Sequence, residues 1–165
     1  MRLHRKPHHP KPHQTAPKNQ TTTPNYETTL PRARNMGKVG IPIMGYCFSL
    51  AGVWGWERGQ YARGKAESVA LVEGSRDFQE PIPDGMIWNM RYRKGEEDKF
   101  VPETSENEVW ERLEFFLNQL IPVVEENNVS LAAHPNDPPL AVLRKTGRVL
   151  KNPYSLLLKP HTLLF

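Results

Sequence analysis

Residues 105–134 read SENEVWERLEFFLNQLIPVVEENNVSLAAH, and this stretch decides the fold class. Ser105 with Glu108 three residues later is a capping box, which predicts the start of a helix. Apolar side chains then recur at the i, i+3, i+4 spacing of an amphipathic helix: Val109, Leu113, Phe116, Leu117, Leu120 and Val124. Pro122 should kink or restart this helix, because proline removes a backbone donor. A helix, a polar turn and the short apolar strand 129–133 make half of a βαβ unit, so we predict a parallel α/β sheet.

A second apolar run lies upstream, at residues 39–48, VGIPIMGYCF. Both of its alternating faces are apolar, which suits a buried parallel strand. Pro42 argues against a regular strand, since proline cannot donate to a ladder. Residues 49–104 show no sustained periodicity, and a loop of that length inside a compact domain is usually functional.

The first 34 residues contain six prolines and four histidines, with almost no large apolar side chain. Such a segment cannot bury enough surface to offset its ordering entropy, so we predict a disordered tail. Residues 1–38 carry eight Lys or Arg against one acid, a net charge of +7. The rest of the chain carries fourteen against seventeen, a net charge of −3, so the positive charge of the protein comes from the tail. Metal capture and nucleic-acid binding are alternatives to a solvated tail. No Phe, Trp or Tyr is interleaved for base stacking among residues 1–25, which hold five of these eight basic residues, and this disfavours nucleic acid.

The bulk composition narrows the class of protein. The chain of 165 residues suits one domain but is short for a complete eight-stranded α/β barrel, which typically needs ~250. Its single cysteine, Cys47, excludes an internal disulfide and favours a reducing compartment. No stretch approaches the ~18 consecutive apolar residues of a membrane span, and the tail has no secretory core. We therefore expect a cytoplasmic protein that makes no membrane contact.

Three groups of residues are candidates for chemistry. His134 ends the apolar run and opens a rigid turn at the carboxyl end of a strand, where α/β folds place their sites. It is either a metal ligand or a hydrogen-bonded structural histidine. Asp137 suits either of two roles: accepting a hydrogen bond from the imidazole and so orienting it, or capping the turn at Pro138.

The second group, Trp56, Arg58 and Arg63, follows the 39–48 strand. Aromatic and guanidinium groups pack on sugar rings and pair with carboxylates, so we predict a substrate-binding role, with coverage of the core as the alternative. The third candidate is a near match to a phosphate-binding loop at residues 59–66, GQYARGKA. Ala66 replaces the hydroxyl that would bind Mg²⁺, and no predicted strand precedes the loop, so we do not predict nucleotide binding.

Several long strings occur in one order along the chain: NMGKVGIPIMGYCFSLAGVWGW at 35–56, ARG at 62–64, AES at 66–68, WNMRY at 88–92 and AHPNDPP at 133–139. Together they resemble mannonate dehydratase and its close relatives over roughly residues 24–150. The resemblance implies a fragment of a (β/α)₈ TIM barrel of the sugar isomerase/dehydratase type. It also implies a hydro-lyase of hexuronate catabolism that converts D-mannonate to 2-keto-3-deoxy-D-gluconate and water.

A Mn²⁺ or Fe²⁺ ion would act in that family as a Lewis acid, held by a His, a Cys, a second His and an Asp from successive strand ends. His134 matches the first ligand. The other three have no counterpart before the chain diverges at 153–165. Cys47 stands where the family usually has Asn, and Asn136 stands where Asp is usual. We therefore expect weak metal binding and little or no turnover by this chain alone.

The sequence thus predicts a disordered basic tail at 1–34, a partial barrel domain at 35–152 and a divergent tail at 153–165. The leading hypothesis is a mannonate dehydratase-like enzyme that this truncation impairs, with D-mannonate as substrate. A non-enzymatic protein whose basic tail binds nucleic acid or another polyanion is the alternative. A homodimer that completes the barrel between two chains is a third hypothesis.

Overall fold

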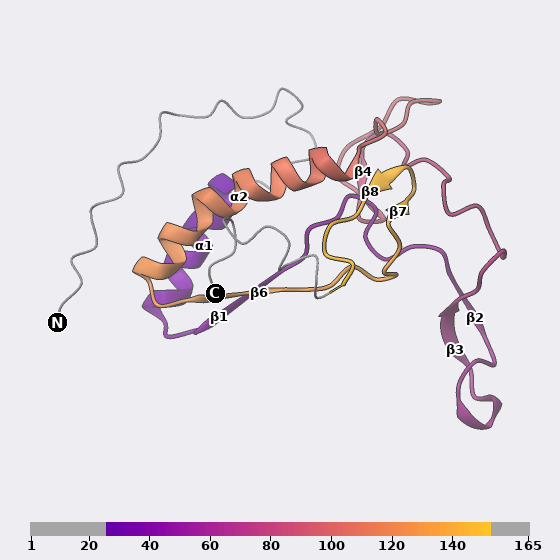
Figure 1. Ribbon diagram of the computed structural model, residues 1–165, viewed down its shortest axis with the longest axis horizontal. Coiled ribbons are helices and arrows are strands. Elements are labelled where there is room, and N and C mark those ends of the chain that lie inside the picture. The colour runs from indigo at the N-terminus through magenta and orange to yellow at the C-terminus, as the bar shows by residue number, and fades with distance from the viewer. Residues whose placement is uncertain (1–25, 153–165) are drawn as a thin grey trace.

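The computed structural model describes residues 26–152, and Figure 1 shows how their elements are arranged. The main body contains helix α1 (Tyr26–Lys38), helix α2 (Glu106–Glu126), and strands β1 (Ile43–Tyr46) and β6 (Ser130–Ala133). Three antiparallel strand pairs lie toward one end of it in Figure 1: β2 (Trp56–Gly59) with β3 (Ser68–Leu71), β4 (Met86–Ile87) with β5 (Met90–Arg91), and β7 (Val142–Leu143) with β8 (Thr146–Gly147). The short helix η1 (Arg63–Lys65) lies between β2 and β3.

Helix α2 begins as the capping box predicts. The Ser105 hydroxyl accepts a hydrogen bond from the Glu108 amide at 3.2 Å, and the Ser105 amide donates to the Glu108 carboxylate at 2.7 Å. The helix continues through Pro122 to Glu126, so the predicted restart does not occur. Leu120 and Val123 on either side of the proline are both buried, and this packing keeps the helix in place.

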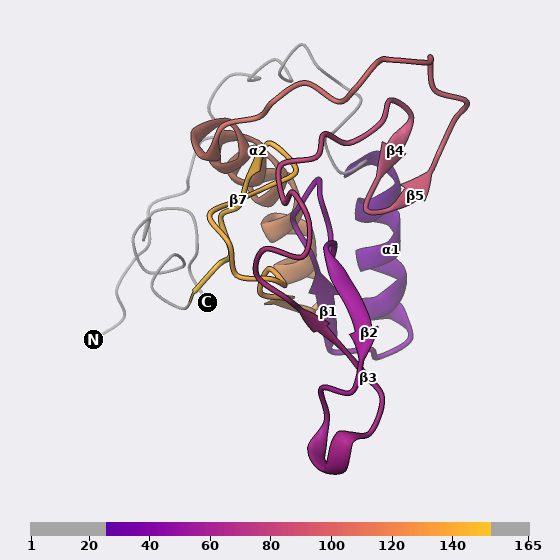
Figure 2. The same ribbon diagram turned by 90° about the vertical axis from the view of Figure 1, so that its right-hand side faces the viewer.

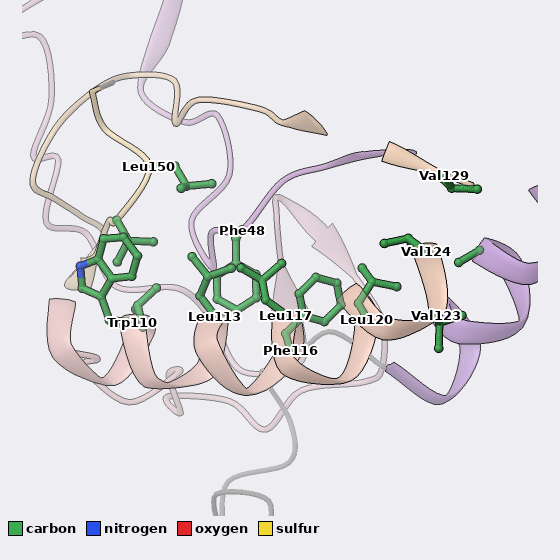
Figure 3. Packing of buried hydrophobic residues seen from close by; sticks show 13 residues of the cluster. Phe48, Trp110, Leu113, Phe116, Leu117, Leu120, Val123, Val124, Val129 and Leu150 are labelled. Carbon is green, nitrogen blue, oxygen red and sulfur yellow. The ribbon is translucent and has the colours of Figure 1, made fainter. Parts of the chain in front are cut away.

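The predicted parallel sheet is confirmed by the pairing of β1 with β6. Ile43 lies opposite Ser130 and Tyr46 opposite Ala133. Helix α2 packs on one face of the pair, and Figure 3 shows its apolar side chains directed toward the strand segments. The Phe116 ring lies 6.1 Å from Tyr46 and 5.8 Å from Phe48, between ring centroids. A single apolar core therefore joins the helix to β1 and the residues that follow it.

The expectation that β1 is buried on both faces is wrong. In β1 and β6 alternate residues are exposed, including Ile43, which is 59% exposed. Both helices lie to one side of the strand pair in Figure 1. The reason is that no further element of the described residues packs on the second face.

The prediction of a disordered tail at residues 1–34 is wrong for residues 26–34. Residues 26–34 belong to α1, while residues 1–25 lie outside the described residues, as does the predicted divergent tail at 153–165. Ala33 is fully buried, and Leu30 and Met36 pack against the same core as α2. Leu30, Ala33 and Met36 are spaced three residues apart and therefore lie on one side of α1. Their packing against α2 stabilises a helix in a segment whose composition predicted disorder.

The region 49–104 is not one structureless loop. It contains the β2–β3 and β4–β5 hairpins, and Figure 2 shows the β2–β3 hairpin projecting away from the helices. In the part of the chain that the structure describes, β1–β6 is the one parallel pair, and the α/β class is thereby confirmed. No helix of this part is long and apolar enough to cross a membrane.

Candidate site at the strand ends

His134 lies at the carboxyl end of β6 and continues its pairing with β1. Its amide donates a hydrogen bond to the Tyr46 carbonyl oxygen at 2.8 Å. The ring Nδ1 lies 2.6 Å from the Pro135 carbonyl oxygen, and because a carbonyl only accepts, Nδ1 carries the proton. In the neutral imidazole this tautomer leaves the Nε2 lone pair for another partner, on a side chain that is exposed to solvent.

The turn after His134 is held by the segment that follows β8. The backbone amide of Asn136 donates a hydrogen bond to the Leu150 carbonyl oxygen at 2.7 Å. The backbone amide of Arg148 donates to the Ala141 carbonyl oxygen at 3.0 Å. The peptide bond between Asp137 and Pro138 is cis. The predicted orienting role of Asp137 concerns the ring of His134. The acceptor at His134 Nδ1 is the Pro135 carbonyl oxygen, and Asp137 is exposed.

Arg148 ties this turn to the loop after β1. Its side chain is 1% exposed and donates to the Gly52 carbonyl oxygen at 3.1 Å and to the Asp137 carbonyl oxygen at 3.2 Å. Burial lowers the pKa of Arg148 to about 10, an effect that the nearby Asp137 carboxylate opposes. The guanidinium is therefore charged at neutral pH and joins two strand-end loops through backbone acceptors.

Two buried donors in this region lack an acceptor among the described residues: Arg148 Nε and Asn136 Nδ2. A buried donor without a partner costs about 1–3 kcal/mol. Native proteins keep few such groups. Arg148 Nε and Asn136 Nδ2 are therefore the positions in this region where an ordered water would find a donor.

The predicted substrate-binding residues lie elsewhere. Trp56 and Arg58 belong to β2 and Arg63 to η1, all on the projecting hairpin, and all three are exposed. Arg58 Nη1 lies 3.9 Å from the Glu67 carboxylate of the same hairpin. Within residues 26–152 the structure therefore does not bring these three side chains to His134.

A second arginine was also missed by the sequence analysis. Arg144 is 4% exposed and donates to the carbonyl oxygens of Glu80 at 3.2 Å and Pro81 at 3.0 Å. Its guanidinium lies 4.8 Å from the centroid of the Trp54 ring, and burial lowers its pKa. Nothing in the pattern LRKTGRV distinguishes Arg144 and Arg148 from surface arginines, because their acceptors are backbone atoms distant in sequence.

The donor set does not make a complete metal site. His134 offers Nε2, but no three His, Cys, Asp or Glu side chains converge anywhere in the described residues. Cys47, which follows β1 directly and is the one cysteine of the sequence, is exposed and forms no disulfide. A transition-metal site needs three or four protein ligands, so the described part of the chain can supply one of them and not the set.

Comparison with known proteins extends over most of the chain. The sequence model of the D-mannonate dehydratase family (UxuA) matches residues 5–157. A mannonate dehydratase from Streptococcus suis (strain 05ZYH33) is 30% identical over 140 residues, which are 78% of this chain and 37% of the relative. One from Streptococcus pneumoniae (strain 70585) is 32% identical over 129 residues, covering 72% of this chain and 34% of the relative.

A solved structure agrees with the sequence matches. The crystal structure of mannonate dehydratase from Streptococcus suis serotype 2 superposes with a TM-score of 0.59 at 26% identity. It covers 84% of this chain, whereas this chain covers 36% of it. The chain therefore spans a little more than a third of the length of the relatives that it matches.

Proposed function

Since this chain belongs to the D-mannonate dehydratase family, we propose that it is the His134-bearing part of a hydro-lyase that dehydrates D-mannonate to 2-keto-3-deoxy-D-gluconate. The match to the family over residues 5–157 supports this proposal. The β1–β6 parallel pair would then be part of a (β/α)₈ barrel, whose sites lie at the carboxyl ends of the strands. Hexuronate breakdown in the cytoplasm is the setting that this activity implies.

The observation that carries the proposal is the state of His134. Its Nδ1 proton is directed to a backbone carbonyl, and its Nε2 is free at the carboxyl end of a parallel strand. A metal-ligating histidine commonly has this arrangement, because an acceptor on one ring nitrogen fixes the tautomer of the other. We assign His134 as one ligand of a Mn²⁺ or Fe²⁺ ion, which would supply Lewis-acid chemistry when bound.

The positions of the other candidate residues decide which roles we propose for them. Asp137 contributes its backbone carbonyl to Arg148 and thereby helps to hold the turn. Trp56, Arg58 and Arg63 bind the sugar acid only if the β2–β3 hairpin reaches a substrate held at the strand ends. This chain alone, with one ligand among its described residues, should turn over mannonate little or not at all.

The test uses the full chain and Mn²⁺. Paramagnetic broadening of the amide signals of residues 133–136 should appear at millimolar Mn²⁺ and should be lost in His134→Ala. Cys47→Ser is the matched control, because it removes an exposed soft ligand and should leave the broadening unchanged. In parallel, 2-keto-3-deoxy-D-gluconate is measured after addition of D-mannonate. Robust turnover that His134→Ala leaves intact would refute the ligand assignment.

The alternative, a polyanion-binding protein, depends on the basic residues 1–38. The structure describes only residues 26–38 of that segment, where they form α1. The alternative predicts an affinity for nucleic acid that falls steeply with salt and disappears when residues 1–25 are deleted. The same chain, with and without this segment, tests it by fluorescence anisotropy.

A further inference from the structure

Cys47 and His134 lie side by side at the carboxyl ends of two paired strands. The last matched residues of β1 and β6 are Tyr46 and Ala133, so the next residue of each segment is Cys47 and His134. The His134 amide donates to the Tyr46 carbonyl oxygen at 2.8 Å, which is a bond that this next pairing requires. Neighbouring strands lie about 4.8 Å apart, and at this separation the two side chains begin.

Both side chains leave the strand pair on the same face. Side chains alternate along a strand, and the exposure of the residues follows this alternation. Cys47 is exposed and Tyr46 before it is half-buried; His134 is exposed and Ala133 before it is half-buried. Tyr46 and Ala133 pack against the core of α2. The thiol and the imidazole therefore both point away from that core.

Each of the two side chains offers one donor atom that suits a borderline-soft cation. The Nδ1 of His134 is bonded to the Pro135 carbonyl oxygen, so the neutral imidazole offers Nε2. Cys47 forms no disulfide, and its thiol becomes a thiolate ligand when a metal binds and the proton passes to solvent. Zinc–sulfur and zinc–nitrogen bonds of about 2.3 and 2.1 Å place the two donor atoms about 4 Å apart, which adjacent residues can span.

We propose that Cys47 and His134 form a two-ligand site for a borderline-soft divalent cation, with Zn²⁺ as the ion that fits best. Thiolate and imidazole are zinc ligands, whereas Mn²⁺ prefers oxygen, so the thiol adds a second ligand only for the softer ion. No third His, Cys, Asp or Glu of the described residues joins the pair, so water completes the coordination and the affinity is modest. The inference shares the ligand role of His134 with the proposed function and does not depend on dehydration of D-mannonate.

The pair changes the metal preference that the family resemblance implies. The resemblance places Asn at the position of Cys47, so the thiol next to His134 is a feature of this chain. A Zn²⁺ ion held by the pair uses the same Nε2 that the proposed function assigns to Mn²⁺ or Fe²⁺. Zn²⁺ should therefore compete with Mn²⁺ for His134, and affinity for a given set of donors rises from Mn²⁺ to Zn²⁺.

The experiment titrates Co²⁺, as a spectroscopic substitute for Zn²⁺, into the reduced full chain and records the sulfur-to-cobalt charge-transfer absorption. Cys47 is the one cysteine of the sequence, so this absorption reports Cys47. We expect a band that saturates at one Co²⁺ per chain, that an equal concentration of Zn²⁺ removes and that the same concentration of Mn²⁺ leaves. Absence of the band, or its removal by Mn²⁺ as readily as by Zn²⁺, would overturn the proposal.

Two variants test whether His134 is the partner of Cys47. His134→Ala should weaken Co²⁺ binding by about tenfold or more, since one of two ligands is lost. The matched control replaces His8 and His9 together with alanine, because the histidine-rich segment outside the described residues is the other source of imidazole. This control should leave the band unchanged, and circular dichroism checks that the helices of both variants are intact. A band that persists in His134→Ala and disappears in the control would overturn the site.

The outcomes also separate this inference from the proposed function. Mn²⁺ broadening that is lost in His134→Ala, without any sulfur-to-cobalt band, supports the ligand role in the proposed function and overturns the Cys47–His134 site. A band that depends on His134, without Mn²⁺ broadening and without 2-keto-3-deoxy-D-gluconate, supports the site and contradicts the proposed function.

Discussion

Replacing Arg148 with methionine should loosen the turn that carries His134. The Gly52 and Asp137 carbonyl oxygens would lose their donors, at 3.1 and 3.2 Å in the native chain. Gly52 is buried, and a buried acceptor left without a partner costs about 1–3 kcal/mol, whereas Asp137 is exposed and its carbonyl oxygen can bond to water instead. Methionine keeps part of the side-chain volume and removes the desolvation cost of the buried charge, so the penalty is partly offset. We expect a net loss of about 2 kcal/mol in the free energy of unfolding.

Urea unfolding followed by circular dichroism measures this loss. With a slope of about 1–3 kcal/mol per molar urea, the midpoint should fall by about 1 M. Hydrogen exchange adds a local readout, because the Asn136 amide that donates to Leu150 should lose protection. Arg144→Met is the matched control: Arg144 is similarly buried, but its bonds go to Glu80 and Pro81.

The comparison between the two variants decides the reasoning. Arg144→Met should also lower the urea midpoint. After correction for this loss of global stability, the hydrogen-exchange protection of the Asn136 amide should stay close to that of the native chain. An unchanged midpoint in Arg148→Met would refute the assigned hydrogen bonds. Equal loss of Asn136 protection in both variants would show that Arg148 has no specific hold on the turn.

Two other predictions concern the start of α2. The Ser105 amide and hydroxyl lower the pKa of Glu108, so its stabilising effect is present above the usual value near 4.5 and is lost as the pH falls through the lowered folded value. Melting temperatures at pH 7 and pH 3 check this: Glu108→Gln should be less stable than the native chain at pH 7, and the difference should shrink at pH 3. Gly147→Ala should destabilise by about 1–3 kcal/mol, because its Cβ would lie 2.6 Å from Glu106 Cα and 2.7 Å from the Ser105 carbonyl carbon. Gly45→Ala, with open space around its Cβ, is the control in thermal unfolding, and an equal effect of the two would contradict the clash.

The elements around α2 could be predicted from the sequence because their determinants are local. The capping box, the apolar periodicity and the short strand at its end each depend on residues within one or two turns of one another. The structure places α2 and β6 close to the predicted bounds. The ordered strings that resemble mannonate dehydratase were equally available, and the family match confirms them.

Helix α1 and the hairpins of 49–104 could not be predicted in the same way. Tyr26–Lys38 has weak local preference for a helix, with Pro31 inside it, and gains its stability from packing Ala33 on the core of α2. The hairpins are short and two-stranded, and such strands have little periodicity to detect. For these segments the composition indicated loops and a tail, whereas contacts distant in sequence decided the outcome.

The candidate site, too, could be predicted from the sequence only in part. The sequence by itself determined the family and the position of His134 at a strand end. Only the tertiary structure decided that Nε2 is the free ring nitrogen, that Arg148 holds the turn, and that Trp56, Arg58 and Arg63 lie on a separate hairpin. It also decided that alternate residues of β1 and β6 are exposed. The physical reason is that a residue's type fixes its possible donors and acceptors, while the partners that satisfy them come from chain segments brought together by folding.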